Sequence, residues 1–196
     1  MPFNHLKETP SQTGGPYVHI GTLPAVAGLP VRTQDIMHVL TSSGCAGERI
    51  RIEGVVLDGS GAPVTDALLE LWQADPAGRH DNPNFPGFGR AAADFTTGEW
   101  MFETLKPGIL PWRDARLQAP HVSLLIFARG INIHLHTRMY FSDEASANAL
   151  DPVLRSIDQV GRRATLVGTR RDDGDAVIYR FDIRLQGEGE TVFFDC

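Results

Sequence analysis

The sequence predicts an all-β protein, an antiparallel β-sandwich with short helices and an extended N-terminal arm. About eight short segments rich in β-branched and aromatic residues follow one another, and turns containing glycine and proline separate them. Helical periodicity is confined to a few short stretches. A chain of 196 residues, 42% of them hydrophobic, can bury one substantial core, so we expect a single domain over residues 1–196.

Residues 1–45 are expected to form an arm and a short helix, and residues 46–196 the sandwich. The segment Thr9–Tyr17 is rich in proline, glycine and hydroxyl side chains and can contribute little to a core, so it predicts the extended arm. A short helix is predicted at Thr33–Leu40, where Thr33 could serve as the N-cap of an apolar stripe.

The first strands are predicted from β-branched runs that end at turn residues. Arg49–Leu57 is such a run, and Asp58–Gly61 turns the chain after it. Ala67–Gln73 is the next predicted strand. The long segment Asp75–Arg90, rich in proline, glycine and asparagine, then interrupts the sheet, and loops of this length are usually functional or disordered. Trp100–Leu105 follows as a strand with Trp100 and Phe102 on one face.

The second half of the chain has the clearest strand patterns. His121–Ala128 is mostly apolar, and Ile131–Phe141 alternates apolar with polar or aromatic side chains. Two short helices are predicted next, at Ser142–Leu150 and directly after the pair Asp151-Pro152, where aspartate caps and proline takes the first helical position. A final hairpin is predicted to turn at Asp173-Gly174.

Charge and composition exclude several classes of function. A net charge of −6 and a pI near 5.6 provide no basic surface for nucleic acid. The N-terminus lacks the apolar core of a signal peptide, and the longest apolar run is too short to span a bilayer. Two cysteines, Cys45 and Cys196, do not form a disulfide framework. We therefore expect a soluble cytoplasmic protein with neither a nucleic-acid nor a membrane partner.

Two short patterns could carry chemistry. His134 and His136 lie two residues apart on a predicted strand, so their imidazoles point to one side and could chelate a metal. They could equally belong to the polar face of a half-exposed strand, and no third ligand is obvious. Arg129-Gly130 follows a strand directly; it could bind a carboxylate through the guanidinium fork, or it could be an exposed turn.

The arm offers a third pattern. Between Ser11 and Tyr17 it combines hydroxyl groups, a Gly-Gly backbone and a rigid proline. Such a segment can pack against another surface and present backbone N–H groups to a ligand. The alternative is a terminus without a binding role.

Several segments in order resemble the intradiol ring-cleaving dioxygenases, and the resemblance covers nearly the whole chain. The segments are Leu69–Asp75, Ala77–Arg79, Phe88–Arg90, Lys106–Gly108 and Pro120–Ser123. Three further stretches are similar to the alpha-type chain of those members that combine an alpha and a beta chain: Thr9–Tyr17, Phe127–His136 and Gly187–Asp195.

The resemblance implies a ferric ion held by two tyrosinates and two histidines. Matched to this sequence, the four ligand positions hold His80, Leu110, His121 and Ser123. Leucine cannot bind iron and a serine hydroxyl is a poor ligand, so no metal is expected on this chain. His80 and His121 could still form a weak two-histidine site for a divalent metal.

The resemblance also implies a role for this chain in a neighbouring active site. A homologous beta chain would bind Fe(III) and cleave protocatechuate with O₂ to 3-carboxy-cis,cis-muconate, and no catalytic residue would lie on this chain. The positions that match the family's substrate-cavity contribution are Thr13, Gly14, Gly15, Pro16 and Arg129. The alternatives are a metal-free scaffold or binding sandwich without a catalytic role, and a homo-oligomer with its own metal.

Overall fold

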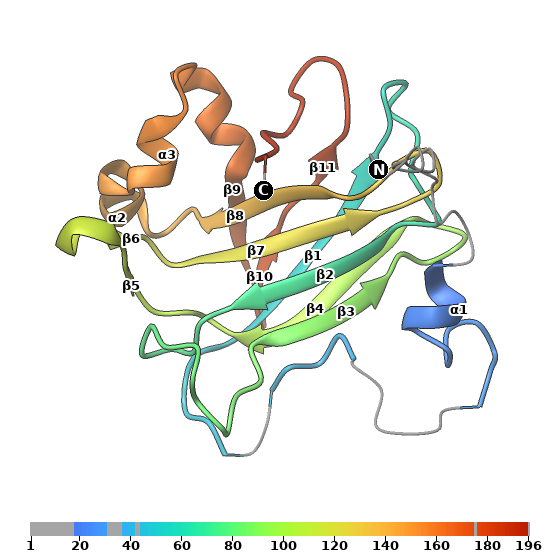
Figure 1. The fold of residues 1–196 in the computed structure, drawn as a ribbon, viewed down its shortest axis with the longest axis horizontal. Helices are drawn as coiled ribbons and strands as arrows, with labels where there is room; N and C mark the ends of the chain where they lie inside the picture. Colours follow the sequence, from blue (N-terminus) through green and yellow to red (C-terminus); the bar gives the residue numbers. More distant parts are fainter. Residues whose placement is uncertain (1–17, 31–36, 42–43, 175, 196) are drawn as a thin grey trace, which may run out of the picture.

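The computed structural model describes residues 18–30, 37–41, 44–174 and 176–195, which fold as a nearly closed β-sandwich (Figure 1). Its strands are β1 (Arg49–Leu57), β2 (Leu68–Gln73), β3 (Phe88–Ala92), β4 (Glu99–Leu105), β5 (Leu110–Pro111), β6 (Leu117–Gln118), β7 (His121–Phe127), β8 (Leu135–Phe141), β9 (Val167–Asp173), β10 (Ala176–Arg180) and β11 (Ile183–Arg184). The α-helices within these residues are α1 (Val18–Thr22), α2 (Ala145–Leu150) and α3 (Pro152–Ser156), and 3₁₀ turns occur at Arg113–Ala115 and Val160–Leu166.

The order of the strands confirms the all-β prediction but makes the sheet mixed instead of purely antiparallel. The hydrogen-bonded order is β11-β1-β10-β9-β8-β7-β2-β3, with β4 paired to β1 and β5 paired to β6. Most ladders are antiparallel, whereas β1 pairs in parallel with both β10 and β11, and β8 pairs in parallel with β9. Long connections separate these parallel partners in sequence, as parallel pairing requires.

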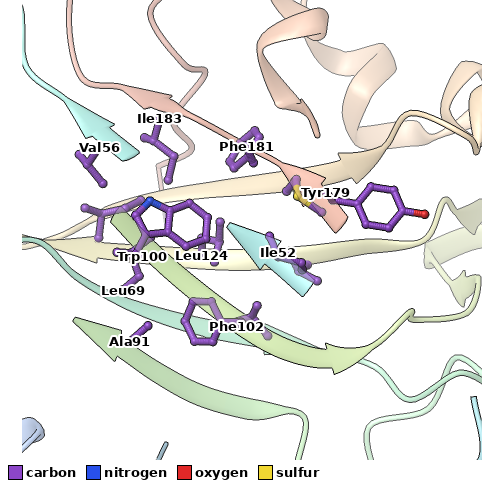
Figure 2. Packing of buried hydrophobic residues seen from close by; sticks show 14 of the residues in the cluster. Ile52, Val56, Leu69, Ala91, Trp100, Phe102, Leu124, Tyr179, Phe181 and Ile183 are labelled. Carbon is purple, nitrogen blue, oxygen red and sulfur yellow. The ribbon is translucent and has the colours of Figure 1, made fainter. Parts of the chain in front are cut away.

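Strand β1 lies at the centre of one layer and alternates buried with partly exposed residues along its length. Figure 2 shows Ile52 and Val56 of β1 pointing into the same cluster as Trp100 and Phe102 of β4. The two β4 rings meet edge to face with centroids 6.1 Å apart, which confirms the predicted shared face. Leu124 of β7 closes the core from the other layer.

The last strand is divided where it passes Gly54. Val177 and Tyr179 pair with the first half of β1, and Ile183 pairs with its second half. Between them, a side chain on Gly54 would come within 1.9 Å of the Phe181 carbonyl oxygen, so only glycine allows this approach. The close backbone approach at Gly54 thus coincides with the division of the chain after the predicted hairpin turn into the two short strands β10 and β11.

Two predicted elements differ from the structure. In the predicted helix Thr33–Leu40, residues 33–36 lie outside the described residues, and the rest is not helical: the Leu40 N–H donates to the Glu103 carbonyl at 2.8 Å. Strand β8 begins at Leu135, four residues later than predicted. Gly130, with φ +86°, turns the chain after β7, so the alternating residues before Leu135 form a loop.

The other predicted strands and helices that fall on described residues agree with the structure to within a few residues, including the Asp151 cap, whereas β3 begins where the sequence predicted the end of the loop Asp75–Arg90. The Asp151 carboxylate accepts hydrogen bonds from the backbone N–H groups of Val153 and Leu154 at the start of α3. Helix α1 was not predicted, because five residues with a glycine and β-branched side chains give little helical signal. No described helix is long and apolar enough to cross a membrane.

Candidate functional site

A cavity of about 210 Å³ brings together all four positions that the sequence matched to ligand positions. His80, Leu110, His121 and Ser123 come from separate parts of the chain and share this one space. The other lining residues belong to the neighbouring strands and loops: Trp72, Gln73, Ala74, Gln118 and Arg138. The fold therefore retains the geometry of a pocket at these positions, and the side chains decide what the pocket can hold.

His80 is held by a loop that Asp75 organises. The buried Asp75 carboxylate accepts hydrogen bonds from the backbone N–H groups of Ala77 and Arg79, each at 2.9 Å, and from the Asn82 amide at 2.8 Å. These bonds lower the pKa of Asp75 even though burial alone would raise it. The His80 ring stacks on Trp72, with centroids 5.5 Å apart and planes 9° apart.

Leu110 reaches the cavity because two loops approach each other closely. Gly78, with φ +75°, lies so near the Ile109 carbonyl oxygen that an added Cβ would be 2.0 Å away. This contact joins the His80 loop to the short strand β5, on which Leu110 is 7% exposed. The pairing of Leu110 with Gln118 on β6 then fixes the apolar side chain in the cavity wall.

His121 is a buried, neutral imidazole. Its Nδ1 lies 2.8 Å from the Ala119 carbonyl oxygen, so Nδ1 carries the proton. Burial, together with the positive charge of Arg138, lowers the pKa of His121 to about 4. The Tyr140 ring packs beside it with centroids 5.5 Å apart. At neutral pH His121 therefore adds no charge to the cavity.

Tyr140 is close to His121 but is not available as a phenolate. Its hydroxyl donates to the Asp151 carboxylate at 3.1 Å. Burial, with the negative charge of Asp151, raises the pKa of the phenol above its ordinary value. The group stays protonated and fixed on Asp151.

Arg138 is one of the cavity residues that sequence reasoning did not select. It lies on β8 opposite Ser123 of β7, and its Nη1 donates to the Gln118 side-chain oxygen at 2.9 Å. The alternation along β8 carried a signal, because Arg138 falls in the same two-residue series as His136 and Tyr140. The cross-strand register that aims it at the cavity was not readable from the sequence.

The lining residues do not fit a ferric ion. They provide two imidazoles and one hydroxyl, but no phenolate or carboxylate, and a leucine occupies one of the four positions. The guanidinium of Arg138 adds a positive charge to the same space, which opposes the binding of any cation. Among the described residues, no cluster of three or more histidine, cysteine or acidic side chains could hold a metal.

Arg129 lies far from this cavity. It follows β7 directly, whereas His121 begins the same strand, and the length of β7 separates the two ends by about 20 Å. The Arg129 side chain is 71% exposed, and its Nε lies 3.3 Å from the Asp66 carboxylate. The other candidates for the substrate cavity, Thr13, Gly14, Gly15 and Pro16, lie outside the described residues.

The pair His134 and His136 is not part of this cavity. The His134 ring packs against Phe127 with centroids 5.8 Å apart, and the His136 ring packs against Phe194 at 5.7 Å. His134 precedes β8 and His136 lies within it. Both rings are thus used in packing contacts with aromatic neighbours.

Comparisons with known proteins agree on one family. A sequence model of the family described as Dioxygenase matches residues 24–187. The chain is 51% identical to the protocatechuate 3,4-dioxygenase alpha chain of Pseudomonas putida, with all of both chains covered. It is 36% identical to the protocatechuate 3,4-dioxygenase beta chain of Burkholderia cepacia, over 74% of this chain and 67% of that one.

The fold is shared with solved structures of more distant sequence. A catechol 1,2-dioxygenase from Pseudomonas arvilla C-1 superposes with a TM-score of 0.60 at 20% identity, covering 88% of this chain and 67% of that one. The dioxygenase domain of a carbohydrate-binding fusion protein from Streptomyces sp. SirexAA-E superposes with a TM-score of 0.59 at 23% identity, covering 95% of this chain and all of that one.

Proposed function

The chain belongs to the intradiol dioxygenase family, and from that premise we propose that it is the alpha-type, iron-free subunit of a protocatechuate 3,4-dioxygenase. The observation that carries the proposal is the 51% identity with the Pseudomonas putida alpha chain over the full length of both chains. The enzyme is a hetero-oligomer in this proposal. Its beta chain is a homologue of the present chain, as the 36% identity to a beta chain supports.

Iron belongs to the beta chain in this proposal. Fe(III) supplies the chemistry of intradiol cleavage, in which both atoms of O₂ enter the product 3-carboxy-cis,cis-muconate and no reductant is consumed. The present chain offers His80, Leu110, His121 and Ser123 at the corresponding positions, and this set does not suit ferric iron. Catalysis by a homo-oligomer with its own iron is therefore disfavoured by the donor set.

The contribution of this chain lies at the far end of β7. Arg129 is exposed there and can offer its guanidinium to an anionic group outside the chain. It cannot reach the cavity of its own chain, because β7 separates the two by about 20 Å. We assign Arg129, with Thr13, Gly14, Gly15 and Pro16, to the wall of the substrate cavity on the beta chain. The assembled enzyme is cytoplasmic in this proposal.

Coexpression with the homologous beta chain tests the function. The two chains should copurify as a coloured complex with about one ferric ion for each alpha–beta pair, and the complex should consume protocatechuate and O₂ in equal amounts. The chain expressed alone should contain no stoichiometric iron. A colourless chain that never binds the beta homologue would favour the scaffold alternative. Stoichiometric iron in the chain alone would contradict the assignment of the metal.

A further inference from the structure

Arg129 lies in a tight turn that directs its side chain outward. The Ile131 N–H donates to the Ala128 carbonyl at 3.1 Å, and Gly130, with φ +86°, takes the third position of this turn. Arg129 takes the second position, and its side chain is 71% exposed. The guanidinium is therefore presented to groups outside the chain.

The strand register places a buried carboxylate beside this arginine. Leu68 of β2 is opposite Phe127 of β7 in an antiparallel pair. Two residues further along in the same register, Asp66 is opposite Arg129. Asp66 is 9% exposed, and its Oδ2 accepts a hydrogen bond from the Arg129 backbone N–H at 3.3 Å and lies 3.3 Å from the Arg129 Nε. Because the backbone N–H belongs to the turn, the carboxylate stays in place when the guanidinium moves.

The ion pair with Asp66 leaves the outer part of the guanidinium to an outside anion. The guanidinium nitrogen nearest to Asp66 is Nε, and neither Nη1 nor Nη2 donates a hydrogen bond to any residue that the structure describes. The two Nη groups together can bind the two oxygens of a carboxylate. An anion bound there would lie near two opposite charges, the guanidinium of Arg129, which attracts it, and the carboxylate of Asp66, which repels it.

The chemistry of the proposed reaction gives this repulsion a use. Protocatechuate carries one carboxylate, and cleavage between its two hydroxyl-bearing carbons gives a product with three. An arginine without a counter-ion would attract the product more strongly than the substrate, because Coulomb attraction grows with the charge of the ligand. A fixed carboxylate beside Arg129 reduces this difference, because its repulsion of the ligand grows with the same charge.

We propose that Asp66 is a specificity-determining residue of the assembled enzyme, in which it weakens the attraction of Arg129 for anionic ligands and favours release of the more highly charged product. The inference rests on the proposed function, because it takes Arg129 to lie in the wall of the substrate cavity. Asp66 thereby also limits the preference for an anionic aromatic ring over the same ring without a charge.

Inhibition kinetics of the assembled alpha–beta complex test the role of Asp66. Asp66→Asn keeps an oxygen that can accept from the Arg129 N–H but removes the charge, so KM for protocatechuate should fall about threefold. The inhibition constant of 3-carboxy-cis,cis-muconate should fall about tenfold, because this product carries three carboxylates. The inhibition constant of catechol, the ring without the carboxylate, should not change. An unchanged or raised KM would overturn the inference, and so would an equal change for catechol, which a structural defect would produce.

Three further variants serve as controls. Asp66→Glu, which keeps the charge, should not lower KM. Glu190→Gln removes the counter-ion of another surface arginine, Arg162, and should leave every constant unchanged. If Asp66→Asn does not assemble, Asp66→Ser replaces it, with the same expected fall in KM.

Arg129→Ala separates this inference from the proposed function. If Arg129→Ala raises KM but Asp66→Asn does not lower it, the inference on Asp66 fails alone. If Arg129→Ala leaves KM unchanged, the place of Arg129 in the substrate cavity fails, and the inference fails with it.

Discussion

At the scale of single residues, two arginines have opposite environments. Arg129 is 71% exposed at the end of β7 and pairs loosely with Asp66 at 3.3 Å, so its guanidinium can exchange this partner for another anion at little cost. Arg138 is partly buried in the cavity and bonds to Gln118. Of the two guanidiniums, that of Arg129 is therefore the more accessible to a group outside the chain.

Replacement of Arg129 by alanine should raise KM for protocatechuate in the assembled enzyme by about tenfold, because a hydrogen bond to a charged group contributes about 1.5 kcal/mol or more. Steady-state kinetics with parallel iron analysis measures this effect, and the iron content should not change. Arg162→Ala is the control, since Arg162 also forms an exposed ion pair. A KM equal to that of the wild type would remove Arg129 from the substrate cavity.

At the scale of elements, one cluster of charges joins four parts of the fold. Asp143, before α2, accepts a hydrogen bond from Lys106 after β4 at 2.8 Å and from Arg170 of β9 at 3.1 Å. The Tyr179 hydroxyl of β10 also donates to it at 3.0 Å. Burial opposes ionisation, but the bonds from Lys106 and Tyr179 lower the pKa of Asp143 below its usual value.

Asp143→Asn should lower the free energy of unfolding at pH 7 by about 2 kcal/mol, because it removes an acceptor of charge-assisted hydrogen bonds from a partly buried site. The folded pKa lies below that of the unfolded chain, about 3.9, so the carboxylate stabilises the fold above that pH. Its contribution is lost as the pH falls through the folded pKa. The difference in the free energy of unfolding between the wild type and Asp143→Asn should therefore become smaller in acid.

Denaturant unfolding at pH 7 and pH 3 measures both effects. Asp172→Asn is a suitable control, because Asp172 pairs with the same Arg170 at 3.2 Å but its side chain is 65% exposed. The free energy of unfolding of Asp172→Asn should fall by less than about 0.5 kcal/mol at either pH. If Asp143→Asn lowers the free energy of unfolding by the same amount at both values of pH, the charge of the Asp143 carboxylate does not stabilise the fold.

At the scale of the whole molecule, β7 connects the cavity of this chain with the exposed turn at Arg129. Its first residue, His121, lines the cavity of this chain, and Arg129 follows its last residue at the opposite end. The rigid strand keeps these regions about 20 Å apart. The exposed end of β7 at Arg129 and the cavity at His121 are therefore separate regions of the surface.

Deletion of residues 1–17 tests the role of the arm in the assembly. The truncated chain should still form the sandwich, since the strands of the described residues supply a large core of their own, but it should assemble with the beta chain more weakly or give a raised KM. Size-exclusion chromatography and steady-state kinetics of the coexpressed complex measure these outcomes. Wild-type assembly and turnover by the truncated complex would exclude a role for Thr13 to Pro16.

The sequence by itself determined the class of fold, most of the strands, the Asp151 cap and the matched positions His80, Leu110, His121 and Ser123. These features depend on local patterns or on ordered motifs, which can be read along the chain. Only the tertiary structure decided that β1 pairs in parallel with β10 and β11, since pairing over long connections leaves no local pattern. It also decided that Arg138 faces Ser123, because the register of two strands depends on the packing of the whole sandwich.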